Sequence, residues 1–210
     1  MNIKKLLSLL LITFFSSIGT GSTVSFSLIV STEDGKTKLK DAAVTMVPLF
    51  KLTETNSVKA HEMSQKDEVF IPKVLTVKTG DMVTFPNQDN FNHHVYSFSK
   101  TKTFELPFYK KGDPLPPPIK IEKSGITIVG CNIHDSMRAY IVSSPSPFHG
   151  VTNSSGLVRI DNLPKGKFRL EVWHPGLPTG SKPKAFSVDT NKPYQSPPTI
   201  KLNAKPLSDF

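Results

Sequence analysis

The stretch Gly125-Ile-Thr-Ile-Val-Gly-Cys-Asn-Ile-His-Asp-Ser-Met137, followed directly by Arg138-Ala-Tyr-Ile-Val142, decides the fold of this chain. Its alternating apolar residues on either side of a short polar centre predict a strand, a tight loop and a second strand. Within the loop, the spacing C-x-x-H-x-x-M sets Cys131, His134 and Met137 three residues apart. Folding the loop back brings these side chains to one ion, and with a second imidazole this donor set suits copper in a trigonal site with a weak axial methionine.

The second imidazole must come from another segment, and Asn92-His93-His94-Val95 offers two candidates. Only one of two adjacent side chains on a strand can face the metal, because successive side chains point to opposite faces. We favour His93, in which case His94 lies beside the site or on the surface. The alternative is that His94 is itself the ligand. The other histidines are interpreted as structural or surface residues: His61, His149 and His174.

Each of these ligands also has an interpretation without a metal. Met137 is in phase with Ala139 and Ile141 and would suit a protein core, and His134 would suit an exposed loop. Cys131 is the sole cysteine, so it is a metal ligand, an inert buried thiol, an intermolecular link or a nucleophile activated by a nearby imidazole. Zinc accepts a cysteine and two histidines as well, but it leaves the spacing of the methionine unexplained. The joint occurrence of all four donors favours copper.

A longer pattern resembles the cupredoxins, such as plastocyanin and amicyanin: Phe70-x-Pro72, then Val77-x-x-Gly80-Asp81-x-Val83-x-Phe85-x-Asn87, a histidine, and Cys131-x-x-His134-x-x-Met137. The match covers residues 62–144, the loop spacing is similar to that of amicyanin, and the whole chain resembles the exported "methylamine utilization protein" group. This resemblance implies a Greek-key β-sandwich that holds one type 1 copper ion through His93, Cys131, His134 and Met137, with His134 near the surface. The chain departs from the pattern at His94, where the resembling proteins have an asparagine that ties the ligand strand to the copper loop.

The rest of the chain is also typical of strands, since short alternating runs are separated by turn clusters and eighteen prolines. The predicted class is therefore all-β. Residues 24–49 and 148–175 resemble the opening and closing halves of a carboxypeptidase-regulatory-like or transthyretin-like sandwich. We expect a second small β-sandwich from residues 24–60 and 146–203, with the cupredoxin domain of residues 62–144 inserted into it. The alternative is an N-terminal strand added to the cupredoxin, followed by an independent C-terminal domain.

The N-terminus begins with the basic MNIKK, continues with the apolar LLSLLLITFF and ends in small residues, which is typical of a secretory signal peptide, here residues 1–22. The apolar run is shorter than the roughly 20 residues of a membrane span, so no stable membrane insertion is expected after cleavage. The predicted location is the periplasm or the exterior.

Lysine and arginine outnumber aspartate and glutamate by 26 to 17. A basic surface favours encounter with an acidic redox protein or an anionic membrane surface. Nucleic acid is a poor candidate partner, because the lysines are scattered between the strands. The prediction is a carrier of single electrons between periplasmic partners and not an enzyme, since a catalytic copper cluster would need further histidines. The alternatives are a copper-binding or delivery protein and an interaction module that copper stabilises.

Overall fold

Strands are the only regular secondary structure in residues 23–52 and 57–207, which are the residues that the computed structural model describes. The all-β prediction is confirmed. Within the same residues, no helix has the length and apolar character to cross a membrane. The predicted signal peptide, residues 1–22, lies outside the described residues.

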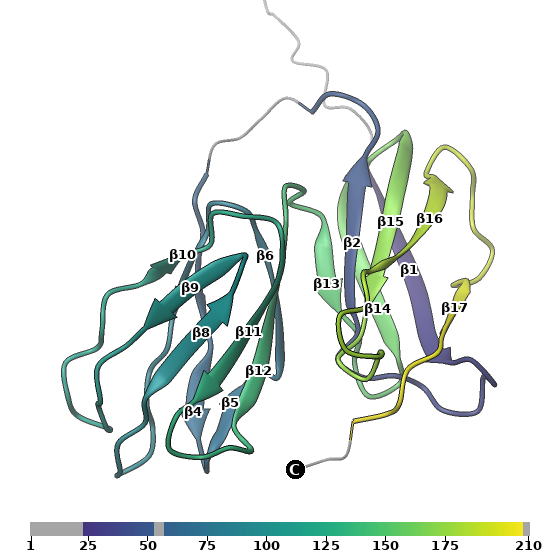
Figure 1. The fold of residues 1–210 in the computed structure, drawn as a ribbon. Helices are drawn as coiled ribbons and strands as arrows, with labels where there is room; N and C mark the ends of the chain where they lie inside the picture. The colour runs from purple at the N-terminus through teal and green to yellow at the C-terminus, as the bar shows by residue number, and fades with distance from the viewer. Residues whose placement is uncertain (1–22, 53–56, 208–210) are drawn as a thin grey trace, which may run out of the picture.

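Two β-sandwiches lie side by side (Figure 1). The first contains a five-stranded sheet in the order β6-β12-β11-β8-β9, a three-stranded sheet in the order β10-β7-β3, and the hairpin of β4 and β5. Its strands are β3 (Ala60–Glu62), β4 (Ser64–Lys66), β5 (Val69–Ile71), β6 (Val74–Lys78), β7 (Met82–Thr84), β8 (Val95–Ser99), β9 (Lys102–Glu105), β10 (Ile119–Lys120), β11 (Gly125–Cys131) and β12 (Arg138–Ser144). These strands lie in the segment for which the sequence predicts a cupredoxin sandwich.

Alternation along β11 and β12 builds the inner face of the first sandwich. Thr127, Val129 and Cys131 are buried on β11, and Ala139 and Ile141 are buried on the antiparallel neighbour β12. The residues between them point to the opposite face of the sheet, as the two-residue period of a strand requires. Cys131 is thus the last inward-facing side chain before the loop, and it belongs to the apolar core of this sandwich.

The second sandwich is made from the two ends of the described chain. Its sheets have the orders β14-β1-β17 and β13-β2-β15-β16. Its strands are β1 (Thr23–Thr32), β2 (Ala43–Pro48), β13 (His149–Val151), β14 (Leu157–Pro164), β15 (Lys167–Trp173), β16 (Lys184–Asp189) and β17 (Thr199–Leu202). β1 pairs with β14, and β2 pairs with β15. The early segment therefore belongs to the same sandwich as the late strands, and it forms no ladder with the five-stranded sheet of the first sandwich. The exact domain limits given above stay a prediction.

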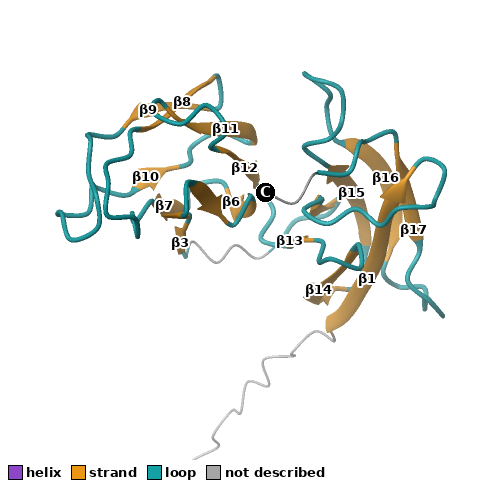
Figure 2. Ribbon diagram, turned by 90° about the horizontal axis from the view of Figure 1, so that it is seen from below, coloured by secondary structure: helices purple, strands orange, loops and turns teal. Residues whose placement is uncertain are grey.

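A small apolar cluster joins the two sandwiches. Trp173, at the end of β15, packs near Val74 and Val142, and its ring lies 5.2 Å from that of Tyr140. Beside this cluster, His149 Nδ1 and Thr76 Oγ1 are 2.9 Å apart across the junction. Seen from below, β13 lies on the side of the second sandwich that faces the first (Figure 2). The outer face of the sheet containing β12 is therefore partly covered by the second sandwich.

Candidate metal centre

The two strands β8 and β11 and the segments next to them present the predicted donors. Cys131 pairs with Val95 and Gly130 pairs with Tyr96, so the start of β8 lies directly beside the end of β11. Val95 is buried and His93 is in phase with it, which turns the His93 side chain inward. The sequence segments that were expected to converge do so at this end of the sandwich.

Backbone hydrogen bonds close the loop after Cys131. The amide of Met137 donates to the carbonyl of His134 over 3.0 Å, and the amide of Cys131 donates to the carbonyl of Met137 over 3.2 Å. The amide of Asn132 donates to the carbonyl of His94 over 3.0 Å, which ties the loop to the segment before β8. The tie expected from an asparagine side chain is thus made here by backbone groups.

Three soft or borderline donors converge in this space. His93, Cys131 and His134 each offer one ligand atom, and these atoms lie within 4.8 Å of one another. Cys131 Sγ is 3.6 Å from His93 Nδ1 and 4.0 Å from His134 Nδ1. A tetrahedral metal ion with bonds of about 2.0 Å to nitrogen and 2.3 Å to sulfur separates those ligands by about 3.5–3.7 Å. The two distances from Cys131 Sγ are therefore close to those of a metal site. All three ligand atoms lie within 4.8 Å of one another, so binding a metal such as copper would draw them closer together.

The orientation of His93 is set by Asp89. His93 Nε2 lies 2.9 Å from Asp89 Oδ2, and both residues are buried. Nε2 donates to the carboxylate, so the lone pair is left on Nδ1, which faces Cys131. A carboxylate that fixes the tautomer and the ring of a histidine in this way is typical of metal-binding histidines.

Asp89 is itself held in its charged form. Burial raises its pKa, but hydrogen bonds from His93 and from the amides of Asp67 and Glu68 outweigh that effect, so the pKa lies below its ordinary value. The amide of Asp89 donates to Asn87 Oδ1 over 2.8 Å, and Asn87 Nδ2 donates to the carbonyl of Tyr109 over 2.8 Å. The loop before His93 is therefore fixed by hydrogen bonds from several segments.

His134 is the donor that reaches the surface. Its side chain is 22% exposed, whereas His93 is fully buried. Its Nε2 lies 3.9 Å from Glu68 Oε1, and its ring packs 5.8 Å from the half-exposed ring of Phe91. His134 thus connects the buried thiol with the surface of the protein.

His94 points away from the donor cluster. Its ring stacks on Phe108 at 4.3 Å, and its Nε2 lies 2.9 Å from Glu105 Oε1. The other ring nitrogen, Nδ1, is buried without a hydrogen-bond partner in the described part of the chain. Of the two histidines left open by the sequence, only His93 belongs to the cluster of potential ligands.

Met137 is buried in the same core as Cys131, and both of its backbone groups help to close the loop. Its place as the fourth ligand stays a prediction, and so does the complete set of four. Sequence reasoning missed Asp89, Phe91 and Tyr109 as residues that shape this site. A carboxylate four residues before His93 was the available signal for Asp89.

The three histidines outside the cluster have other partners. His61 Nε2 is 2.8 Å from Asp81 Oδ2, and His149 bonds Thr76 at the junction. His174 donates from Nε2 to the carbonyl of Lys40 and accepts at Nδ1 from the amide of Gly176. No second cluster of potential metal ligands occurs in residues 23–52 and 57–207.

Neither a protein-family model nor a curated protein sequence matches this chain. Solved structures with a similar fold include a purple cupredoxin from Nitrosopumilus maritimus, 21% identical, with a TM-score of 0.34 over 40% of this chain and 99% of that one. A reduced Cu(I) form of an amicyanin variant is 18% identical, with a TM-score of 0.35 over 50% of this chain and 99% of the other. A copper-containing nitrite reductase from Thermus scotoductus is 24% identical, with a TM-score of 0.36, but only 24% of its chain is covered.

The fold is all-β, and a His-Cys-His group lies at one end of the first sandwich. Membership of the methylamine utilization protein group stays a prediction.

Proposed function

We propose that this protein is an exported type 1 copper protein that carries single electrons between periplasmic redox partners and catalyses no reaction of its own. The observation that carries this proposal is the convergence of His93 Nδ1, Cys131 Sγ and His134 Nδ1 within 4.8 Å. One copper ion held by these residues and by Met137 would cycle between Cu(I) and Cu(II). The donors come from two segments that hydrogen bonds hold in place.

Rigid placement of the donors supports electron transfer. Asp89 fixes the ring of His93, and backbone bonds at both ends of the loop fix Cys131 and His134. A site whose ligands hardly move between two oxidation states requires little reorganisation when an electron arrives or leaves. The exposed edge of His134 offers the short route between the metal and a docked partner.

Burial of the site favours a carrier over a delivery protein. Cys131, His93 and Met137 are buried, and only His134 has appreciable exposure. Handing a metal ion to an acceptor requires exchange of ligands, and three of these four side chains are out of reach of an acceptor in the folded protein. Slow loss of the metal with fast reversible reduction is therefore expected.

An acidic partner fits the charge of the protein. The excess of positive charge lies mostly in the segments that form the second sandwich, and less of it in residues 57–144. Long-range attraction by such a surface speeds encounter and is screened by salt. We expect the rate of electron exchange with an acidic partner to fall as ionic strength rises, and a rate indifferent to salt would contradict this part of the proposal.

The decisive experiment is to add Cu(II) to the purified protein and record its visible spectrum. Wild-type protein should develop the intense band of thiolate-to-copper charge transfer, and Cys131→Ser should lack it while keeping its circular dichroism spectrum. A wild-type protein without this band would refute the copper proposal. Rapid loss of Cu(I) to a soluble chelator would favour delivery instead.

A further inference from the structure

One long edge of strand β1 in the second sandwich is only half paired. On one side, β1 pairs with β14 from Thr23 to Ile29. On the other side, β17 pairs only with the stretch Ile29–Thr32. In the described part of the chain, no strand pairs with residues 24–28 on that second side.

The direction of the backbone groups follows from the neighbouring bonds. The amide of Val30 donates to the carbonyl of Gly156, next to β14, whereas the amide of Ile29 donates to the carbonyl of Pro198, next to β17. Backbone groups alternate in direction along a strand. The N–H and C=O of Ser27 therefore point away from β14, toward the unpaired side.

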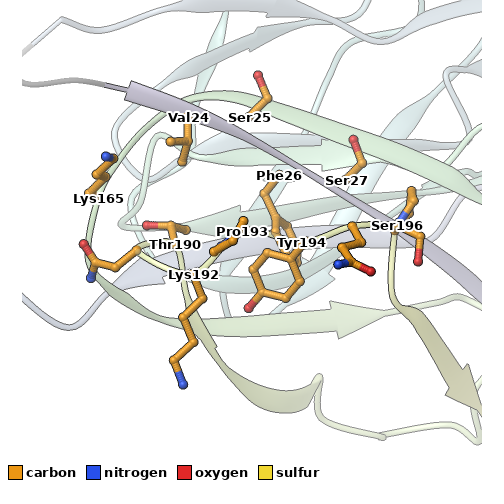
Figure 3. Close-up of a pocket in the computed structure, with 13 residues that line it drawn as sticks. Val24, Ser25, Phe26, Ser27, Lys165, Thr190, Lys192, Pro193, Tyr194 and Ser196 are labelled. Carbon is orange, nitrogen blue, oxygen red and sulfur yellow. The ribbon is translucent and has the colours of Figure 1, made fainter.

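A cavity of about 480 Å³ lies along this edge. One of its walls is the stretch from Val24 to Ser27, and the other is the segment of residues 190–197 (Figure 3). The two walls meet where the ring of Tyr194 packs edge-on against Phe26 at 5.2 Å. This contact gives the cavity an apolar, aromatic side, and its size is within the range of about 300–1,000 Å³ that is usual for ligand sites.

The facing segment does not extend the sheet. It contains Pro193 and Pro197 and is followed by Pro198, and a proline has no N–H to donate to a ladder. An edge that presents unpaired N–H and C=O groups is a template for another strand. Natural proteins use such edges to bind extended peptides, with backbone bonds for affinity and side-chain contacts for specificity.

The charge of the cavity selects the occupant. Lys165 and Lys192 line it, and no carboxylate does. Neither lysine belongs to a salt bridge among the described residues. The nearby Asp161 is held by Arg159 and Ser25, and Asp189 is held by Asn191. The charge of Lys192 contributes to lowering the pKa of Asp189, but the two side chains form no salt bridge among the described residues. The two lysines are thus placed to meet negative charge from outside the chain.

We propose that this edge binds an extended acidic peptide segment of a partner protein, which adds as a strand to β1 beside Ser27. Backbone groups of the peptide pair with the N–H and C=O of Ser27, alternate side chains rest against Tyr194, and acidic side chains meet Lys165 and Lys192. The site is remote from the copper ligands in the fold, and it does not depend on the copper function.

The test uses the full processed protein and a synthetic peptide with capped ends and alternating valine and glutamate. Titration followed by amide NMR should shift the signals of residues 24–28 and 190–197, and amide hydrogen exchange at Ser27 should slow. The same peptide with lysine in place of glutamate should bind at least about tenfold more weakly, because two charge contacts become repulsive.

Two variants address the backbone and the charges separately. Ser27→Pro removes the N–H that faces the cavity but no bond to β14, and it should abolish peptide binding while the rest of the spectrum stays folded. The double variant Lys165→Glu with Lys192→Glu should weaken binding of the glutamate peptide about tenfold and improve binding of the lysine peptide. Lys100→Glu, an exposed lysine in the hairpin of the first sandwich, is the matched control and should change binding less than twofold.

Absence of peptide binding to wild-type protein would overturn the proposal, and so would binding that Ser27→Pro leaves intact. If wild-type protein instead forms dimers that Ser27→Pro abolishes, and the peptide does not compete with them, the edge pairs with a second copy and the proposal is wrong. Binding that follows only the number of glutamates in a scrambled, proline-containing peptide would show simple charge attraction and would also overturn it.

Discussion

Buried or half-buried histidines occur in two regions of this protein, and the two regions use them differently. At the end of the first sandwich, His93 has a carboxylate on one ring nitrogen and a thiol facing the other. At the side of the second sandwich that faces the first, His149 bonds the hydroxyl of Thr76, and His174 has both ring nitrogens satisfied by backbone groups. Burial alone therefore does not mark a ligand. The distinguishing feature is a ring nitrogen that is left with its lone pair facing another metal donor.

The largest expected effect is at the pair His93 and His94. His93→Ala should abolish the intense thiolate-to-copper band, because one of the three converging donors is lost, and added imidazole should restore part of it. His94→Ala should keep the band, because this ring stacks on Phe108 and points to Glu105. Visible spectra of the copper-loaded variants give the answer. The reverse pattern would assign His94 as the ligand.

The next effect concerns the junction, which we expect to matter for stability and not for copper. Trp173→Ala should lower the free energy of unfolding by about 3 kcal/mol, because a large buried ring that contacts Tyr140 and Val142 is removed. Trp173→Phe should cost less. Denaturation followed by circular dichroism measures both. A changed copper band in the folded Trp173→Ala protein would show that the two regions are coupled.

A smaller effect is expected at Asp89, which contacts His93 but neither of the other two potential ligands. Asp89→Asn should lower copper affinity about 10- to 100-fold, because the imidazole loses the carboxylate that orients it. Competition with a chelator gives the affinity. Asp135→Asn in the exposed part of the ligand loop is the matched control for the lost charge. Equal losses in the two variants would mean that charge, and not orientation, is responsible.

The smallest effect is the pH response of His149. Burial, followed by the nearby charge of His61, lowers its pKa to about 4. The unfolded chain takes up the proton near pH 6.5, so stability is complete above that pH and declines as the pH falls toward 4. For a half-buried group we expect a loss of about 1 kcal/mol between pH 7 and 5.

Urea denaturation of the copper-free protein at these two pH values measures the response. His149→Gln should remove most of this difference, since glutamine does not titrate but can still bond Thr76. If the variant keeps the full pH dependence, His149 is not its source, and His174, whose pKa burial also lowers, becomes the candidate.

Most of the architecture could be predicted from local patterns. Alternation and turns identified β11, the ligand loop and β12, and the flanking segments suggested a second sandwich whose halves lie far apart in the sequence. The strands and the loop follow from short-range periodicity, whereas the second sandwich was expected from a resemblance to carboxypeptidase-regulatory-like sandwiches. The cover that Trp173 and Val151 give to the first sandwich could not be predicted, because it depends on how two finished sheets pack against each other.

About as much of the site as of the fold could be predicted from the sequence. Spacing on one loop was enough to bring Cys131 and His134 together. Strand alternation allowed only one of His93 and His94 to face the metal, and the resemblance to cupredoxins favoured His93. The hydrogen bond from His93 to Asp89 joins two residues of an irregular loop, where no period relates sequence to direction. Turn geometry, and not residue type, decides such contacts, so the sequence suggested a carboxylate nearby but not its role.

The discontinuous second sandwich has a consequence for how the chain reaches its native state. Its early strands β1 and β2 are separated from β13 and β14 by the whole of residues 57–144. Closing a flexible loop of that length carries a large entropic cost, and contacts so distant in sequence form slowly. If the inserted sandwich folds first, it holds the two flanking segments close together, so that Pro48 and His149 lie near each other. The outer strands then meet as neighbours, so folding of the insert governs the folding rate of the sandwich around it.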